Sequence, residues 1–145
     1  MRIYLDSCCY NRPFDGHEQL RVHIEALSKM QIQHEIMEGR HELVTSVVLD
    51  YESMKNRDRI AAAKIDDFMN RYSSRYVGND EKNSLGPLRD EIMGTGIRYA
   101  DATHLACAIH AKCDYFITTD DRVLKFKDDR IKVINPVDFI SIKEE

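Results

Sequence analysis

The stretch Arg98–Lys125 (RYADATHLACAIHAKCDYFITTDDRVLK) does most to limit how this chain can fold. It predicts an amphipathic helix, a tight turn and a buried strand, with Asp101 opening the helix and Asp120 following the strand. Tyr115–Ile117 has the aromatic and β-branched residues that fill a central strand. Three small residues let the helix pack close to a sheet: Ala102, Ala106 and Ala108. In open α/β sheets ligands bind beyond the carboxyl ends of the strands, so Asp120 is a candidate for a ligand site.

The rest of the chain repeats this alternation of strands and helices. Further strands are expected at Arg2–Leu5, Glu42–Ser46 and Ile131–Ile134, with a shorter candidate at Tyr76–Val77. Helical patterns separate them, at about Glu18–Glu38, around Glu52, at Ala61–Tyr72 and at Pro87–Met93, where Pro87 suits a first helical position. The segment Gly78–Ser84 is the most loop-like. Such alternation predicts one α/β domain over residues 1–145, with a central parallel sheet and helices on both faces.

Composition excludes several classes of protein. No apolar run approaches the roughly 20 residues of a membrane span, and the first residues enter a strand directly, so a cytoplasmic location without a membrane partner is expected. Cys8, Cys9, Cys107 and Cys113 form no Cys-x-x-Cys pair, which argues against structural zinc and favours free thiols. The net charge of −4 disfavours a nucleic-acid partner, but local basic patches and metal-neutralised carboxylates weaken that objection.

Four acids share a position relative to the predicted sheet. Asp6 and Asp120 follow strands, Asp101 starts a helix, and Glu52 lies early on the helix after Glu42–Ser46. Since the ends of parallel strands and the starts of the following helices meet at one edge, these carboxylates are expected to converge. Unpaired carboxylates in one pocket repel each other, and a divalent cation relieves that repulsion. Mg²⁺ or Mn²⁺ prefers such oxygen ligands and can activate water against a phosphodiester.

Each acid also has an ordinary structural explanation. Asp101 can cap its helix, and Asp120 with Asp121 can form a turn. Glu52 can face solvent, and Asp6 can simply end a strand. It is the joint pattern that favours a metal site.

Four motifs carry a resemblance to a known family: YLDS at 4–7, TSVVLDYES at 45–53, DATHLACA at 101–108 and DYFITTDDRVL at 114–124. In this order they resemble a PIN-domain ribonuclease, of the kind represented by the toxins of VapBC toxin–antitoxin pairs. The resemblance implies a PIN-like three-layer sandwich and Mg²⁺- or Mn²⁺-dependent cleavage of single-stranded or structured RNA. It also implies an antitoxin partner and a homodimer. The residues matching the catalytic and metal-binding acids are Asp6, Glu52, Asp101 and Asp120.

Other residues surround this set. Thr118 matches the hydroxyl residue of a Thr-x-Asp step and, with Ser7 and Asp121, is a candidate to hold a carboxylate or a metal-bound water. Asp121 is better explained as a surface residue, and His104 as a structural residue bordering the site. Cys8 stands where many relatives have Asn, so a polar contact there is expected to be missing. Asp50 competes with Glu52, whose spacing fits better. Basic residues that could guide a phosphate backbone are Arg12, Arg98, Arg122 and Lys125.

The sequence therefore predicts a metal-dependent endoribonuclease, the toxin of a toxin–antitoxin pair. Exposed apolar residues, including Met30, Met37 and Met69, could line a groove for an antitoxin helix or simply pack on each other. The alternative is a non-catalytic PIN-like scaffold that binds RNA or protein. A phosphotransfer domain fits poorly, because Asp6-Ser7-Cys8 lacks the paired acid that such chemistry needs.

Overall fold

A computed structural model describes residues 1–16 and 19–142 of the chain. Its centre is a sheet of parallel strands in the order β3-β2-β1-β4-β5. The strands are β1 (Arg2–Leu5), β2 (Glu42–Ser46), β3 (Ser73–Val77), β4 (Tyr115–Ile117) and β5 (Lys132–Ile134). The chain moves outward from β1 to β3, then returns across the sheet to β4, so the strand order reverses between β1 and β4. Ligand sites of open α/β sheets lie at such a reversal, outside the carboxyl ends of the strands.

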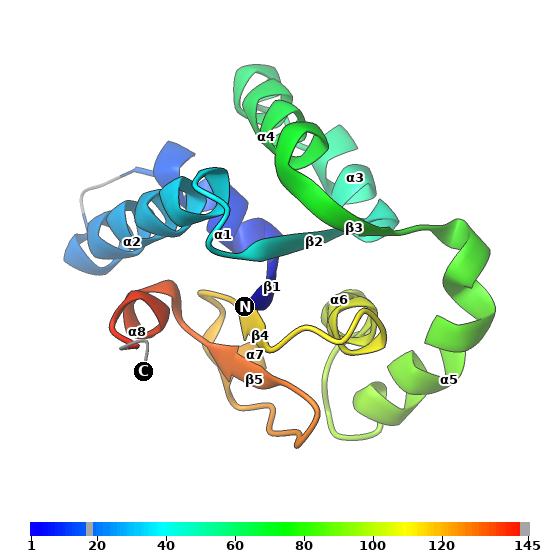
Figure 1. The fold of residues 1–145 in the computed structure, drawn as a ribbon. Coiled ribbons are helices and arrows are strands. Elements are labelled where there is room, and N and C mark those ends of the chain that lie inside the picture. Colours follow the sequence, from blue (N-terminus) through cyan, green and yellow to red (C-terminus); the bar gives the residue numbers. More distant parts are fainter. Residues whose placement is uncertain (17–18, 143–145) are drawn as a thin grey trace.

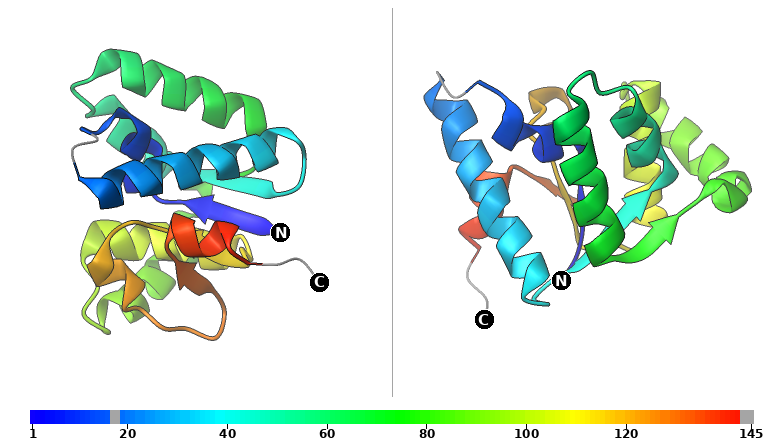
Figure 2. Two further views of the ribbon diagram at one scale, coloured as in Figure 1. Left: turned by 90° about the vertical axis from the view of Figure 1, so that its left-hand side faces the viewer. Right: turned by 90° about the horizontal axis from the view of Figure 1, so that it is seen from above.

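Helices cover both faces of the sheet, which makes a three-layer α/β sandwich as predicted (Figure 1). One face carries α1 (Ser7–Asn11), α2 (Leu20–Met37), α3 (Val47–Met54) and α4 (Arg59–Tyr72), with the 3-10 turn η1 (Arg12–Phe14). The other carries α5 (Lys82–Met93) and α6 (Tyr99–His110), which follow the 3-10 turn η2 (Asn79–Glu81). Two short helices complete the fold: α7 (Asp121–Leu124) and α8 (Pro136–Ile140), the latter packed beside α2 (Figure 2).

The core is built around β1, because helices cover this strand on both faces and strands flank it on both sides. Ile3, Tyr4 and Leu5 are all fully buried, and the Tyr4 ring stacks on Phe116 of β4 at 5.3 Å between centroids. The small residues of α6 are fully buried too, which confirms the predicted close packing of this helix: Ala102, Ala106 and Ala108. The carboxyl edge of the sheet is thereby held in a fixed place.

Several element boundaries differ from the sequence predictions. Pro87 lies inside α5 rather than at its start, because the helix already begins at Lys82, within the predicted loop, and buries Leu85 in the core. The strand expected at Tyr76–Val77 begins earlier, at Ser73, while β5 begins at Lys132 rather than Ile131. For the first long helix, α2 begins at Leu20, and the predicted start at Glu18 lies outside the described residues.

The exposed methionines also differ from prediction in one case. Met30 and Met37 on α2 are 55% and 50% exposed, whereas Met69 of α4 is buried in the core. Met69 falls on the same helical face as Ile65 and Phe68, which packs toward the sheet. None of the helices in the described part of the chain combines the length and apolar character needed to span a bilayer.

Candidate active site

The four predicted acids lie around the carboxyl edge of β1 and β4. Asp6 follows β1 directly, and Asp120 precedes α7 after β4. Asp101 lies in the first turn of α6, close enough for the charges of Asp6 and Asp120 to act on its carboxyl group. Glu52 reaches the same point from α3, through a hydrogen bond with His104 of α6. Carboxylates from two strand ends and two helices therefore lie near the point where the strand order reverses.

Asp6 is the most enclosed of these acids, with 4% of its surface exposed. Its Oδ2 accepts a 2.9 Å hydrogen bond from the Thr118 hydroxyl, and its Oδ1 accepts one of 2.8 Å from the Ser7 backbone N–H. The second bond caps α1, so the ordinary explanation of Asp6 also holds. The Thr118 oxygen in turn accepts from the Asp120 backbone N–H at 3.1 Å. Thr118 thus joins the ends of β1 and β4.

Glu52 is held by a buried histidine. Nε2 of His104 lies 2.7 Å from Oε1 of Glu52 and 4.0 Å from Oδ1 of Asp6. Burial raises the pKa of Glu52, but the hydrogen bond and the charge of His104 lower it by more. The pKa of Glu52 therefore lies below its usual value. Burial lowers the pKa of His104, whereas Glu52 and Asp6 raise it, with a net upward shift. His104, expected only to border the site, contacts it directly.

Asp101 and Asp120 have opposite electrostatic environments. Burial and the negative charges of Asp6 and Asp120 raise the pKa of Asp101. Burial also raises the pKa of Asp120, but hydrogen bonds from Arg122 outweigh it and leave this pKa below its usual value. Asp120 caps α7, whereas the N-cap position of α6 is Arg98 and not Asp101. Capping therefore accounts for part of the role of Asp120 but not for Asp101, whose negative charge is only partly balanced by His104 and Arg122.

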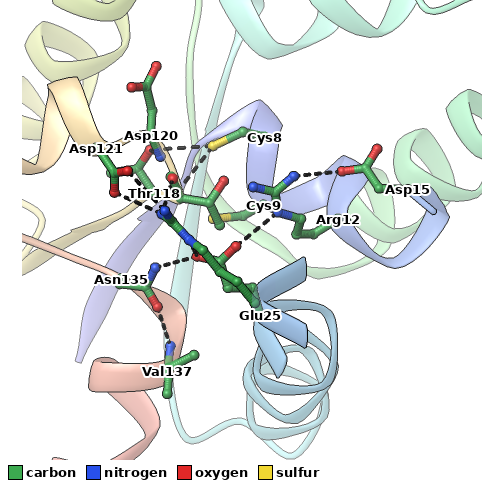
Figure 3. A network of polar contacts seen from close by, with 12 residues as sticks. Cys8, Cys9, Arg12, Asp15, Glu25, Thr118, Asp120, Asp121, Asn135 and Val137 are labelled. Carbon is green, nitrogen blue, oxygen red and sulfur yellow. Dashed lines mark hydrogen bonds and ion pairs between the residues drawn. The ribbon is translucent and has the colours of Figure 1, made fainter. Parts of the chain in front are cut away.

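The residues bordering the acids are engaged in different ways. The Cys8 thiol lies 3.3 Å from the Thr118 hydroxyl and accepts from the Thr119 backbone N–H at 3.3 Å, so this position does make polar contacts (Figure 3). Hydrogen bonding with Cys9 lowers the pKa of Cys8 although burial opposes it. The Asp50 carboxylate accepts from the Tyr76 hydroxyl at 2.6 Å, which leaves Glu52 as the acid at the site.

Glu25 of α2 belongs to an ionic network beside Asp120 and Asp121 that the sequence did not indicate (Figure 3). Arg21, also on α2, is part of this network. Asp121 is exposed and pairs with Arg21 through both carboxylate oxygens, at 2.8 and 2.9 Å. Arg21 also donates to the Thr119 carbonyl oxygen at 3.0 Å. Glu25, 2% exposed, accepts from Arg12, Arg21 and Asn135 at 3.1, 3.2 and 2.6 Å. This network ties α2 to the loop after β4.

The predicted phosphate-guiding residues fall into two groups. Arg12 forms ion pairs with Glu25 and Asp15, and Arg122 forms one with Asp120. Arg98 and Lys125 are exposed beside α6 and α7. Two surface hollows, of about 840 and 770 Å³, both include the start of β5 and the loop before it, and none of the four acids lines either of them. Glu52 borders a smaller hollow of about 20 Å³, together with Ser7.

The four predicted ligands have the chemistry of a Mg²⁺ or Mn²⁺ site, because all of them are carboxylates. The ionised form of Asp101 is destabilised by the charges of Asp6 and Asp120, which a bound cation would offset. Within residues 1–16 and 19–142, however, no three acidic, histidine or cysteine side chains are close enough together to hold one ion. Mg²⁺ commonly binds through one or two carboxylates and several waters. The residues present therefore fit such an ion, with waters completing its coordination.

Comparison with solved structures identifies the architecture. The structure is similar to the crystal structure of VapBC2 from Rickettsia felis bound to a DNA fragment from their promoter, with a TM-score of 0.59, 16% identity and coverage of 93% of this chain and 98% of that one. It is also similar to FitAcB from Neisseria gonorrhoeae, with a TM-score of 0.58, 18% identity and coverage of 92% and 97%. The chain has a PIN-like fold.

Membership of a family does not follow from this fold. No family model and no curated protein matches the sequence. The prediction that the chain belongs to the VapC-type PIN-domain ribonucleases is therefore wrong as a family assignment, because identities of 16% and 18% show the fold alone. The motifs YLDS and TTDD have a structural role in this chain, because each places an acid after a strand, where Asp6 caps α1 and Asp120 caps α7.

Proposed function

We propose that this protein is a metal-dependent endoribonuclease that acts as the toxin of a toxin–antitoxin pair. The supporting observation is that Asp101 faces Asp6 and Asp120 at the reversal of strand order, while His104 brings Glu52 to the same point. Two structures of similar fold, VapBC2 and FitAcB, are toxin–antitoxin complexes. An RNA substrate, an antitoxin partner, a homodimer and a cytoplasmic location belong to the same proposal.

In this proposal Asp6, Glu52, Asp101 and Asp120 hold Mg²⁺ or Mn²⁺, one or two of them directly and the others through waters of its coordination shell. When bound, the ion supplies an activated water and neutralises charge on the phosphodiester. The protein's own groups prepare the site: Thr118 fixes the Asp6 carboxylate, and the Ser7 N–H orients its other oxygen. The exposed Arg98 and Lys125 would contact RNA phosphates. The exposed apolar side chains of α2, Met30 and Met37 among them, would contact the antitoxin.

The test is cleavage of mixed RNA by the purified protein with Mg²⁺ or Mn²⁺, and with EDTA instead. We expect cleavage that EDTA abolishes and that falls by about 100-fold or more in Asp6→Asn and in Asp101→Asn, since each loses a carboxylate ligand. Asp67→Asn, at an exposed position of α4, is the matched control and should cleave normally. Cleavage that survives in both site variants would exclude the acidic cluster. RNA binding without cleavage in either metal would favour the scaffold alternative.

A further inference from the structure

We propose that His104 is a positioning residue for Glu52, and that the Tyr4 hydroxyl in turn fixes the His104 ring. This inference rests on the proposed function, because it assigns the group that prepares one of the metal-binding acids. His104 was expected to be structural, and nothing in the metal chemistry itself requires a histidine.

The geometry is a continuous chain of hydrogen bonds through the core. Nε2 of His104 lies 2.7 Å from Glu52 Oε1, and Nδ1 lies 2.6 Å from the Tyr4 hydroxyl. The Tyr4 hydroxyl is 2.7 Å from the hydroxyl of Ser46, which accepts from the Leu49 backbone N–H at 3.3 Å. Apart from Glu52, every side chain in this series of hydrogen bonds is buried. Both ring nitrogens of His104 are thus engaged, so the ring has one orientation.

The direction of these bonds follows from donor and acceptor chemistry. An ionised carboxylate only accepts, so Nε2 carries the proton that is donated to Glu52. The Tyr4 hydroxyl can donate to Nδ1 or accept from it, with the Ser46 hydroxyl adapting in either case. The hydrogen bond from Nε2 of His104 to Glu52 therefore forms whether or not Nδ1 carries a proton.

The position of His104 explains why this bond matters for the site. Asp101 and His104 lie on α6, while Glu52 lies on α3, which covers the opposite face of the sheet (Figure 1). Glu52 has a long side chain that is 32% exposed, so without a partner it could adopt several rotamers. The bond from His104 ties this side chain to the helix that carries Asp101 and brings it toward Asp6, 4.0 Å from Nε2.

Two substitutions separate positioning from packing. A glutamine amide can reach the place of Nε2, and an asparagine amide can reach only that of Nδ1. We expect His104→Gln to keep Mn²⁺ affinity and RNA cleavage within a few-fold of the wild type. We expect His104→Asn to lose about 10- to 100-fold in both, as substitutions behind metal ligands typically do. Tyr4→Phe, which removes only a hydroxyl, should give a smaller loss in the same direction.

The control is the same pair of substitutions at His110, which lies on α6 like His104 but away from the acids. His110 makes a 3.0 Å hydrogen bond with Glu81 of η2. His110→Asn should leave Mn²⁺ affinity unchanged. Crystal structures of the two His104 variants give a readout that needs neither metal nor activity: Glu52 should stay bonded to residue 104 in His104→Gln and be displaced in His104→Asn.

The outcomes distinguish this inference from the proposed function. If the wild type cuts no RNA, the proposed function fails, and the position of Glu52 in the two crystal structures still decides the role of His104. Equal Mn²⁺ affinity and an unmoved Glu52 in His104→Asn would overturn the positioning role. If that variant does not fold, an unmoved Glu52 and unchanged affinity in Tyr4→Phe would overturn it instead.

Discussion

The Thr118 hydroxyl donates a 2.9 Å hydrogen bond to Oδ2 of Asp6, and its oxygen accepts from the Asp120 N–H. One fully buried side chain therefore connects the acids that follow the two central strands. Asp6 is itself nearly enclosed, so the loss of this donor cannot be fully replaced by bulk water.

Thr118→Val keeps the shape of the side chain and removes this donor and acceptor. We expect it to destabilise the protein by about 1–3 kcal/mol, because it leaves buried polar groups unpaired. RNA cleavage should fall by about 10- to 100-fold. Urea unfolding and cleavage assays measure the two effects. Thr45→Val is the matched control: its hydroxyl is also buried and bonds Ser73 on β3, so stability should fall while cleavage is kept.

Asp101→Asn should stabilise the metal-free protein, since it removes a charge that Asp6 and Asp120 repel. The gain expected in EDTA is on the order of 1 kcal/mol or less, because the carboxyl group is partly exposed and solvent screens it. Mn²⁺ at about 100 times its Kd should raise wild-type stability by about 2.7 kcal/mol, and that of the variant by less. Thermal unfolding with and without Mn²⁺ measures both. A variant less stable than the wild type in EDTA would contradict the repulsion.

Lys29 of α2 gives a pH dependence remote from the acids. It is buried against the rings of Tyr10 and Phe68, and burial lowers its pKa to about 8. Since an unfolded lysine titrates near 10.4, the unfolded chain binds more protons between these values, and this group makes the protein more stable as pH rises. Lys29→Met should therefore be more stable than the wild type at pH 7. This advantage should shrink by about 2 kcal/mol by pH 9.5.

Urea unfolding at the two pH values checks the effect of Lys29. Lys64→Met, at an exposed position of α4, corrects for the loss of a lysine as such. An advantage of Lys29→Met that is equal at both pH values would show that the buried amine does not titrate in this range.

Glu25 should be the most sensitive ionic residue outside the site. Glu25→Ala leaves Arg12, Arg21 and Asn135 without their common acceptor, and breaking a buried ion pair in this way costs about 3–5 kcal/mol. Glu42→Ala, which breaks the exposed pair with Arg2, should cost less than about 1 kcal/mol. Chemical unfolding of both variants gives the comparison. Similar costs for the two would show that the Glu25 network is solvated in solution.

The fold was predictable where a short sequence pattern is compatible with only one kind of secondary structure. The run Ile3–Leu5 followed by Asp6 can hardly be anything but a buried strand that ends in a capping acid, and Tyr115–Ile117 has the same character. Parallel pairing then brings the acids to one edge. Pro87 misled because local preference favours a helix start there, whereas burial of Leu85 extends the helix backward.

The partners of the acids were not predictable in the same way. Arg21 and Glu25 read as an ordinary i, i+4 pair on a helix, and only the fold brings Asp121 and Asn135 to them. His104 gives no sign in the sequence that Tyr4 and Glu52 lie on its two sides. Strand ends are set by local sequence, but contacts between layers depend on how the helices are placed across the sheet.

The pairing of β1 with β4 has a consequence for biosynthesis. Ile3 of β1 lies beside Tyr115 of β4 in the sheet. During synthesis β1 therefore cannot pair with β4 until most of the described chain has left the ribosome. Asp6 meets Thr118 only at that stage. A nascent or truncated chain that lacks β4 therefore cannot bring Asp6 and Asp120 together at one edge of the sheet.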